Sequence, residues 1–205
     1  INFSFNGSSG NTGRCPTESD WSSYININRN GDSDGNGNRN SVLSYVSSHD
    51  TGLHRSSGAT KLGTMLGLLP GGVQIYYGDE TDRPEINGLG DADMMTRGDM
   101  NTFNVPAHWA KICNFRKYNP AVGAGTGDAY KRKYTGPAGN NNVAIGINGG
   151  TVDVSGLFAD GKTVYNWYDG KSTTVSGGSV TFAGGTDTQP ILVSDKNPAN
   201  YGMSY

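Results

Sequence analysis

Two apolar segments that each end in charged residues place the strongest constraint on the fold of this chain. The first runs from Ser41 and finishes on His49-Asp50, and the second runs from Val73 and finishes on Gly78-Asp79-Glu80. A helix is predicted between them over Lys61–Leu69, because its large apolar residues recur at the spacing i, i+3, i+4, i+7, namely Leu62, Met65, Leu66 and Leu69. Strand, helix and strand of this length form a βαβ unit, and parallel α/β enzymes place their chemistry where such strands end.

The same segments carry a resemblance to a known family. SSHDT at 47–51, followed by a helix and by GGVQIYYGDE at 71–80, resembles the late barrel motifs of the α-amylase clan of glycoside hydrolases (glycoside hydrolase family 13). Members of that family end the seventh barrel strand on a His-Asp pair and carry a Gly-x-x-x-x-Tyr-x-Gly-x-Glu-like motif on the eighth. The run from Gly90 to Asn101 resembles the following loop of secreted bacterial α-amylases.

The resemblance implies an α/β plus all-β fold. The opening residues INFSF resemble the sixth barrel strand, so residues 1–120 are expected to be the C-terminal portion of a catalytic (β/α)8 TIM barrel, holding strands six to eight. Residues 121–205 are expected to form the antiparallel β-sandwich domain that follows the barrel. Because three parallel strands cannot close a barrel, we expect the N-terminal remainder of the same enzyme as a partner.

The composition after Gly123 supports an antiparallel domain. Short segments of alternating apolar and polar residues stand between Gly- and Asn-rich turns, and YDG at 168–170 is a turn signal. Strands are predicted at 129–134, 142–147, 163–167, 179–182 and 190–193. Four aromatic residues of this region are candidates for a sugar-stacking patch, but we favour ordinary cross-strand packing for them: Tyr130, Tyr134, Trp167 and Tyr168.

Asp50 is the candidate catalytic residue of this chain. Glycosidic cleavage needs two carboxylates, one acid and one nucleophile or base. The resemblance implies the retaining reaction, with a nucleophile Asp on strand four and an acid Glu on strand five, neither of which lies in this chain. It assigns to Asp50 the role of the third essential carboxylate, which binds sugar hydroxyls and distorts the ring. It assigns to His49 hydrogen bonds to the same sugar.

A second substrate contact is expected in the loop after the eighth strand. Family members hold the next sugars there with an Asp-x-x-x-Arg pair, which Asp93 and Arg97 match. Asp91 is the alternative carboxylate. Arg and a carboxylate both make paired hydrogen bonds, which suits sugar diols. A purely structural salt bridge in this loop is the competing interpretation.

A tentative calcium site is predicted at Asp32, Asp34 and Asn36. Oxygen ligands at alternate positions followed by Gly37 match the first half of an EF-hand-type loop. The twelfth position is Leu43 instead of a bidentate Glu. The alternative interpretation is a solvated Asn/Gly turn that leads into the next strand.

Two further expectations concern the helices and the cysteines. Asp20 is predicted to cap a short helix that buries Trp21, Tyr24 and Ile25, and a last barrel helix is predicted over 106–118. Cys15 and Cys113 permit one disulfide in an exported protein, but we favour a buried free Cys113.

The expected function is a secreted or periplasmic α-amylase-type hydrolase that cleaves α-1,4-glucosidic bonds of starch-like glucans. A net charge of −2 and a pI of about 5.9 argue against a nucleic-acid partner, and no apolar run is long enough to span a membrane. One alternative keeps the fold and changes the reaction: a cyclomaltodextrinase, an α-glucosidase or a glucan transferase. The other is a non-catalytic glucan-binding relative.

Overall fold

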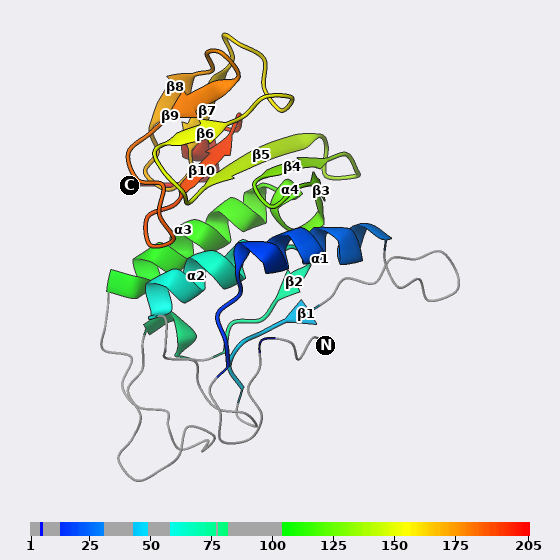
Figure 1. Ribbon diagram of the computed structural model, residues 1–205. Coiled ribbons are helices and arrows are strands. Elements are labelled where there is room, and N and C mark those ends of the chain that lie inside the picture. The colour runs from blue at the N-terminus through cyan, green and yellow to red at the C-terminus, as the bar shows by residue number, and fades with distance from the viewer. Residues whose placement is uncertain (1–4, 6–12, 31–42, 49–57, 77, 82–103) are drawn as a thin grey trace. The chain divides into compact units, whose positions relative to one another are not determined.

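The structure is a computed structural model of residues 1–205, and it describes residue 5 and residues 13–30, 43–48, 58–76, 78–81 and 104–205 (Figure 1). The chain divides into two compact units, Ile1–Ala110 and Lys111–Tyr205, which are described in turn. The division falls inside the helix α3 (Asn104–Tyr118), so the first turns of α3 belong to the first unit and the last turns to the second. This division groups residues by their contacts and does not test where a folding domain ends. The domain boundary expected after residue 120 therefore stays a prediction.

A parallel pair of strands lies in the first unit. The strand β1 (Leu43–Ser44) pairs with β2 (Gly72–Val73), with Leu43 opposite Gly72, and the N–H of Gln74 continues the ladder to the carbonyl of Ser44 at 2.8 Å. The helix α2 (Ala59–Gly67) lies between the two strands in the chain (Figure 1). The predicted strand–helix–strand unit is therefore confirmed.

The second strand of this pair is shorter than the sequence indicates. An apolar strand was expected from Val73 onward through the tyrosines, but β2 ends at Val73 and the side chain of Ile75 is 39% exposed. Among the described residues β2 has one neighbouring strand, and β1 itself is two residues long. A strand continues only where its N–H and C=O groups find partners, so the pairing stops early.

The helix α1 (Glu18–Asn30) begins with a capping box. The main-chain N–H of Thr17 donates to Asp20 Oδ2 at 2.7 Å, and Thr17 Oγ1 accepts from the N–H of Asp20 at 3.4 Å. The prediction that Asp20 is the cap is therefore wrong in position, because Thr17 holds the cap and Asp20 reciprocates from the first turn. Two guanidinium nitrogens of Arg14 also donate to the Asp20 carboxylate, at 2.7 and 2.8 Å.

Indole side chains attach α1 and the first turns of α3 to α2. Trp21 Nε1 donates to the carbonyl of Met65 at 2.8 Å, and Trp109 Nε1 donates to the carbonyl of Ala59 at 2.9 Å. A Cβ at Gly63 would lie 2.9 Å from a ring carbon of Trp109, so this close approach requires glycine. The burial predicted for these helices is confirmed at Trp21, Tyr24 and Ile25 of α1 and at Leu62, Met65, Leu66 and Leu69 of α2 and the turn after it.

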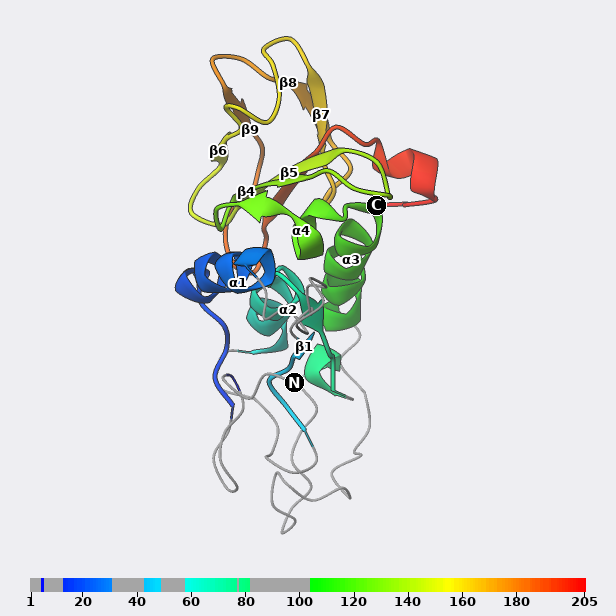
Figure 2. The same cartoon turned by 90° about the vertical axis from the view of Figure 1, so that its right-hand side faces the viewer.

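The strands of the second unit lie in two antiparallel sheets (Figures 1 and 2). One has the order β3-β4-β5-β10-β7-β8, and in the other β6 pairs with β9. The sequence predicted five of these strands and missed β3, β6 and β8, which are two or three residues long. The bounds are β3 (Thr126–Gly127), β4 (Lys131–Tyr134), β5 (Asn141–Gly146), β6 (Thr151–Asp153), β7 (Thr163–Asn166), β8 (Ser172–Thr174), β9 (Ser179–Thr181) and β10 (Ile191–Ser194).

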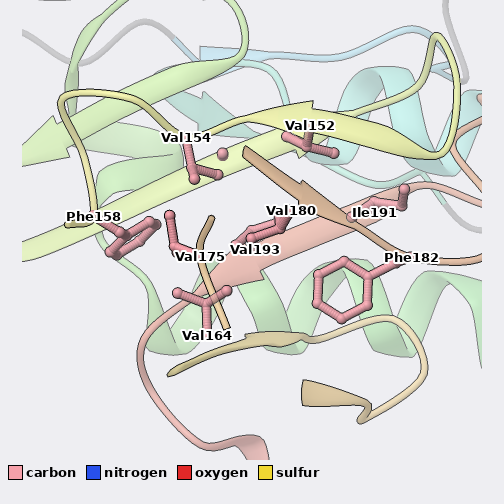
Figure 3. Packing of buried hydrophobic residues seen from close by; sticks show 10 residues of the cluster. Val152, Val154, Phe158, Val164, Val175, Val180, Phe182, Ile191 and Val193 are labelled. Atoms are coloured by element: carbon pink, nitrogen blue, oxygen red, sulfur yellow. The ribbon is translucent and has the colours of Figure 1, made fainter. Parts of the chain in front are cut away.

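An apolar core fills the space between these two sheets (Figure 3). The strand β10 lies between β5 and β7 and is buried along its whole length, with Ile191 and Val193 at 0% exposure. Figure 3 shows Val152 of β6 and Val180 of β9 in the same cluster as Ile191 and Val193 of β10. The cluster consists of Ala144, Val152, Val154, Phe158, Val164, Val175, Val180, Phe182, Ile191 and Val193.

Buried amides join the end of α3 to the sheet of the second unit. Asn119 Oδ1 accepts from Asn141 Nδ2 at 3.1 Å and from Ser194 Oγ at 2.7 Å, while Asn119 Nδ2 donates to the carbonyl of Phe115 at 3.0 Å. The short helix α4 (Ala121–Ala124) is tied in by Asn141 Oδ1, which accepts from the N–H of Ala121. The chain ends after the 3-10 helix η2 (Pro198–Tyr201).

Candidate active site at the carboxyl ends of two parallel strands

Buried polar side chains gather where β1 and β2 end. Ser47 is 0% exposed and Ser48 is 8% exposed, although both follow the apolar residues of the first strand segment. Asp79, which follows the second segment, is 4% exposed. Carboxyl ends of parallel strands are where α/β folds place binding and catalytic groups.

A single carboxylate ties these two strand ends together. Ser47 Oγ donates to Asp79 Oδ1 at 2.5 Å, and the N–H of Tyr76 donates to Asp79 Oδ2 at 3.2 Å. The N–H of Asp79 donates in turn to the carbonyl of Tyr76 at 3.0 Å. We call Ser47, Tyr76 and Asp79 the strand-end cluster.

The turn after the strand-end cluster depends on glycine. Gly78 has φ +96°, a conformation that residues with a Cβ rarely adopt. Its N–H donates to Glu80 Oε2 at 3.1 Å, and the 3-10 helix η1 (Asp79–Thr81) follows. The Gly-Asp-Glu sequence thus directs Asp79 inward and uses Glu80 to hold the turn.

The strand-end cluster immediately precedes the candidate catalytic pair in the chain. Ser47 stands two residues before His49 and three before Asp50. A buried hydrogen bond at Ser47 restricts where the following residues start, so it can orient them. The sequence analysis named Asp79 at the end of the second apolar segment but assigned no role to it, and it did not single out Ser47. The signal that could have identified Asp79 is a carboxylate placed directly after an apolar strand and a glycine.

The site residues inferred from the sequence lie outside the described part of the chain. This holds for the catalytic Asp50, for His49, and for the loop pair Asp93 and Arg97 with its alternative Asp91. Their roles stay predictions. The calcium ligands proposed at Asp32, Asp34 and Asn36 lie outside it too, and within the described ranges no three His, Cys, Asp or Glu side chains form a group that could hold a metal ion.

Trp167, one of the four candidates for a sugar-stacking patch, belongs to a buried aromatic cluster. Trp167 is fully buried, and its ring packs with those of Phe115, Tyr118 and Tyr201 at centroid distances of 5.5 to 6.1 Å. Packing, which the sequence analysis favoured, is therefore the role of Trp167. Tyr168 is half-buried, with the Lys111 ammonium 4.6 Å from its ring centre.

The cysteines and the helices add two further findings. Cys15 and Cys113 form no disulfide, and Cys113 is half-buried instead of fully buried as expected. Burial raises the pKa of the Cys113 thiol, and the charge of Arg116 partly opposes this rise.

None of the helices in the described ranges combines the length and the apolar character that crossing a membrane requires.

Comparison with known proteins confirms the resemblance to the α-amylase clan. No protein-family model matches the chain. Over 91 residues, however, it is 50% identical to the periplasmic alpha-amylase of Escherichia coli K12, a match that covers 41% of this chain and 13% of that protein. The chain therefore spans only a small part of that relative's length.

A solved structure supports the fold. An Anoxybacillus alpha-amylase matches with a TM-score of 0.51 and 19% identity, over 75% of this chain and 38% of its own. A second structure, Ttha1563 from Thermus thermophilus, gives a TM-score of 0.48 with 20% identity over 74% of this chain and 35% of its own, and is too distant to add to the argument. The chain is thus similar in sequence to one α-amylase and in fold to another.

Proposed function

We propose that this chain is the C-terminal part of a retaining α-amylase-type glycoside hydrolase that cleaves α-1,4-glucosidic bonds in starch-like glucans. The observation that carries the proposal is the 50% identity over 91 residues to a periplasmic alpha-amylase. The strand-end cluster supports it, because its buried hydrogen bonds lie directly before His49-Asp50 in the chain. The name of that relative also supports a secreted or periplasmic location. The proposed substrate is an α-glucan, and the proposed process is starch degradation.

The proposed barrel assignment makes β1 the seventh and β2 the eighth strand of a (β/α)8 barrel, with the sixth at the start of the chain. The parallel pairing of β1 with β2 and the position of α2 between them support this assignment. In such a barrel the carboxyl ends of the strands form the catalytic face. The strand-end cluster then belongs to that face.

In this proposal, Asp50 is the third essential carboxylate. Its oxygens accept hydrogen bonds from the hydroxyls of the sugar at the cleaved bond and strengthen them as the oxocarbenium-like transition state forms. His49 donates to hydroxyls of the same sugar. The substitution His49→Ala removes one neutral hydrogen-bond partner of the sugar, whereas Asp50→Asn removes a charged one. His49→Ala should therefore lower kcat by about ten- to a hundredfold, less than Asp50→Asn.

The nucleophile and the general acid are proposed to lie outside the 205 residues. The support is that the chain covers 13% of one relative and 38% of another, so much of a whole enzyme is not represented in it. The 205-residue chain by itself should then show no turnover of soluble starch in a reducing-sugar assay. Robust turnover would show that this chain holds a complete catalytic set.

Two more sites complete the proposal. Arg97 with Asp93, or with Asp91, holds the sugars next to the cleaved residue through paired hydrogen bonds. Asp32, Asp34 and Asn36 bind calcium weakly, because the twelfth ligand of the loop is absent. The double change Asp32→Ala with Asp34→Ala should abolish the rise in melting temperature that added calcium produces, and an unchanged rise would remove this site.

The reaction itself is tested by the anomer that forms first. The enzyme that contains this chain is mixed with maltoheptaose, and the products are followed by proton NMR during the first turnovers. A retaining hydrolase releases the α-anomer first, and shorter maltooligosaccharides accumulate. Release of the β-anomer first contradicts the retaining mechanism, longer oligosaccharides indicate a glucan transferase, and binding without cleavage indicates a non-catalytic relative.

A further inference from the structure

A groove of about 340 Å³ opens on the second unit, and Val152 of the apolar core is among its lining residues. It lies between the start of β4, the end of β5 and β6, and all of its lining residues fall between Asp128 and Asp153. Three of them are apolar and buried: Ile145, Ile147 and Val152. Its volume is within the range of small-molecule sites, which starts at about 300 Å³.

Close packing of the strands sets the shape of the groove. A Cβ at Gly146 would lie 2.5 Å from a methyl carbon of Val152, so glycine lets β6 approach β5 at the bottom of the groove. Gly149, at the turn between these strands, has φ +123°, which again requires glycine. The turn is held by the N–H of Gly149, which donates to the carbonyl of Gly185 at 2.8 Å. The groove is thus built into the backbone and does not need a ligand to form.

The side chain of Tyr130 lines the groove and is held from several directions. It is half-buried, and its hydroxyl accepts a hydrogen bond from Asn148 Nδ2 at 3.2 Å. Its main-chain N–H donates to Asp128 Oδ1 at 2.8 Å, and its carbonyl accepts from the N–H of Ile145 at 2.8 Å. A tyrosine held in this way offers an apolar ring with a polar tip, and it loses little conformational freedom when a ligand binds.

An ammonium and a carboxylate at the rim of the groove form an ion pair. Lys131 Nζ lies 2.7 Å from Asp153 Oδ2 and donates to Ser155 Oγ at 3.4 Å. The hydrogen bond from Lys131 holds the pKa of Asp153 well below its usual range, so both partners stay charged at neutral pH. A second carboxylate of the lining, Asp128, accepts from the main-chain N–H groups of Tyr130 and Lys131, so the lining carries one negative charge in excess and disfavours an anionic ligand. Its donors and acceptors can bind hydroxyl groups.

We propose that this groove binds a short segment of an α-glucan chain. A sugar ring has an apolar face that fits an aromatic side chain and an apolar floor, and its hydroxyls match the rim of Asn148, Lys131 and Asp153. The proposal rests on the proposed function for its choice of α-glucan among carbohydrates. Bound here, a long glucan raises the local concentration of its other segments for the enzyme.

The test is a titration of the 205-residue chain with maltoheptaose by calorimetry. Tyr130→Ala should raise Kd by about tenfold, because it removes the ring that contacts the sugar. Asn148→Ala should raise Kd less, since it removes one rim donor and releases the tyrosine hydroxyl. Tyr134→Ala is the matched control, because Tyr134 lies at the end of β4, four residues after Tyr130, but does not line the groove. The double change His49→Ala with Asp50→Asn should leave this Kd unchanged.

Each other outcome overturns the proposal. These outcomes are no binding at about 10 mM maltoheptaose, equal effects of Tyr130→Ala and Tyr134→Ala, or loss of binding only when His49 and Asp50 change. Asn148 is exposed, so Asn148→Ala tests the groove even if Tyr130→Ala fails to fold. If groove binding is absent while the whole enzyme cleaves α-glucans, only this inference fails. If the groove binds α-glucan and the whole enzyme cleaves none, only the proposed function fails.

Discussion

The two units of this molecule use buried polar groups in different ways. In the first unit the buried carboxylate of Asp79 joins the ends of two parallel strands, next to the segment that carries the candidate chemistry. In the second unit Arg132 is fully buried, and its guanidinium donates to the main-chain carbonyls of Val122 and Ala129 at 2.6 to 3.2 Å. Burial lowers the pKa of Arg132 to about 9, so it still carries its charge at neutral pH.

This difference separates the residues that hold a fold from those that orient a site. Asn141 and Arg132 hydrogen-bond main-chain groups of the short helix α4, and Asn119 links Asn141 to Ser194, which is a structural task. Asp79 instead connects two strand segments, one of which continues in the sequence to His49 and Asp50. Substitutions in the second unit should therefore change stability first, and substitutions in the strand-end cluster should change activity first.

Trp167→Ala is expected to have the largest effect on stability. Trp167 is 0% exposed, packs among three aromatic rings and donates from Nε1 to the carbonyl of Lys196 at 2.9 Å. Removing a buried Trp side chain costs about 3–5 kcal/mol in the free energy of unfolding. Urea unfolding of the 205-residue chain measures this loss, with Trp167→Phe as the milder control. A loss below about 1 kcal/mol would mean that the aromatic cluster does not hold the second unit together.

Asp79→Ala tests the other side of the comparison. It leaves the Ser47 hydroxyl and the Tyr76 N–H without this acceptor, which should cost about 1–3 kcal/mol. In the whole enzyme we expect kcat to fall by roughly tenfold with a smaller change in KM, because the cluster positions groups that act in the transition state. Asp79→Asn keeps one acceptor oxygen and should recover part of kcat. Loss of stability with an unchanged kcat would make the strand-end cluster purely structural.

Thr17→Ala should have a smaller effect, confined to α1. It removes the hydroxyl of the capping box, and loss of such a cap costs about 1 kcal/mol. Ser19→Ala, an exposed position in the same first turn, is the control for helix propensity. Equal unfolding midpoints for the two variants in urea would contradict the cap assignment.

Tyr205→Phe should produce the smallest effect, a loss of stability that is present below about pH 10 and disappears as the pH rises toward 12. Burial, aided by the charge of Asp169, raises the pKa of Tyr205 to about 12, and its hydroxyl donates to the carbonyl of Trp167 at 2.9 Å. An unfolded tyrosine titrates near pH 10. The folded state thus holds this proton more tightly, so the contribution to stability is complete below about pH 10 and is lost as the pH rises toward 12. Urea midpoints from pH 9 to 12 should fall less steeply for Tyr205→Phe than for the parent, and identical slopes would contradict this account.

The sequence predicted the parts of the fold that rest on local pattern. The spacing of Leu62, Met65 and Leu66 identified α2, and alternating segments between glycine-rich turns identified five strands of the second unit. It missed β3, β6 and β8, because strands of two or three residues carry too few alternations to form a pattern. It also overestimated β2, since the extent of a strand depends on a neighbouring strand that is distant in sequence.

Prediction of the candidate site was limited in the same way, because contacts between residues distant in sequence leave no local pattern. The His49-Asp50 pair was recognised through the order of motifs, and its role stays a prediction, while the sequence match to an α-amylase supports the family resemblance. The role of Asp79 could not be predicted in the same way, because its hydrogen bond to Ser47 joins residues 32 positions apart. The groove beside Tyr130 likewise depends on β6, a strand that the sequence analysis did not predict.

The central claim is that this chain contributes Asp50 to the cleavage of α-glucans. The measurement is kcat on soluble starch for the whole enzyme with Asp50→Asn, beside Asp195→Asn, which changes an exposed aspartate of the second unit. The account predicts a fall of at least about a thousandfold for Asp50→Asn with an unchanged melting temperature, because the lost interactions form mainly in the transition state. It predicts parent activity for Asp195→Asn. A kcat within a few-fold of the parent for Asp50→Asn would contradict the claim.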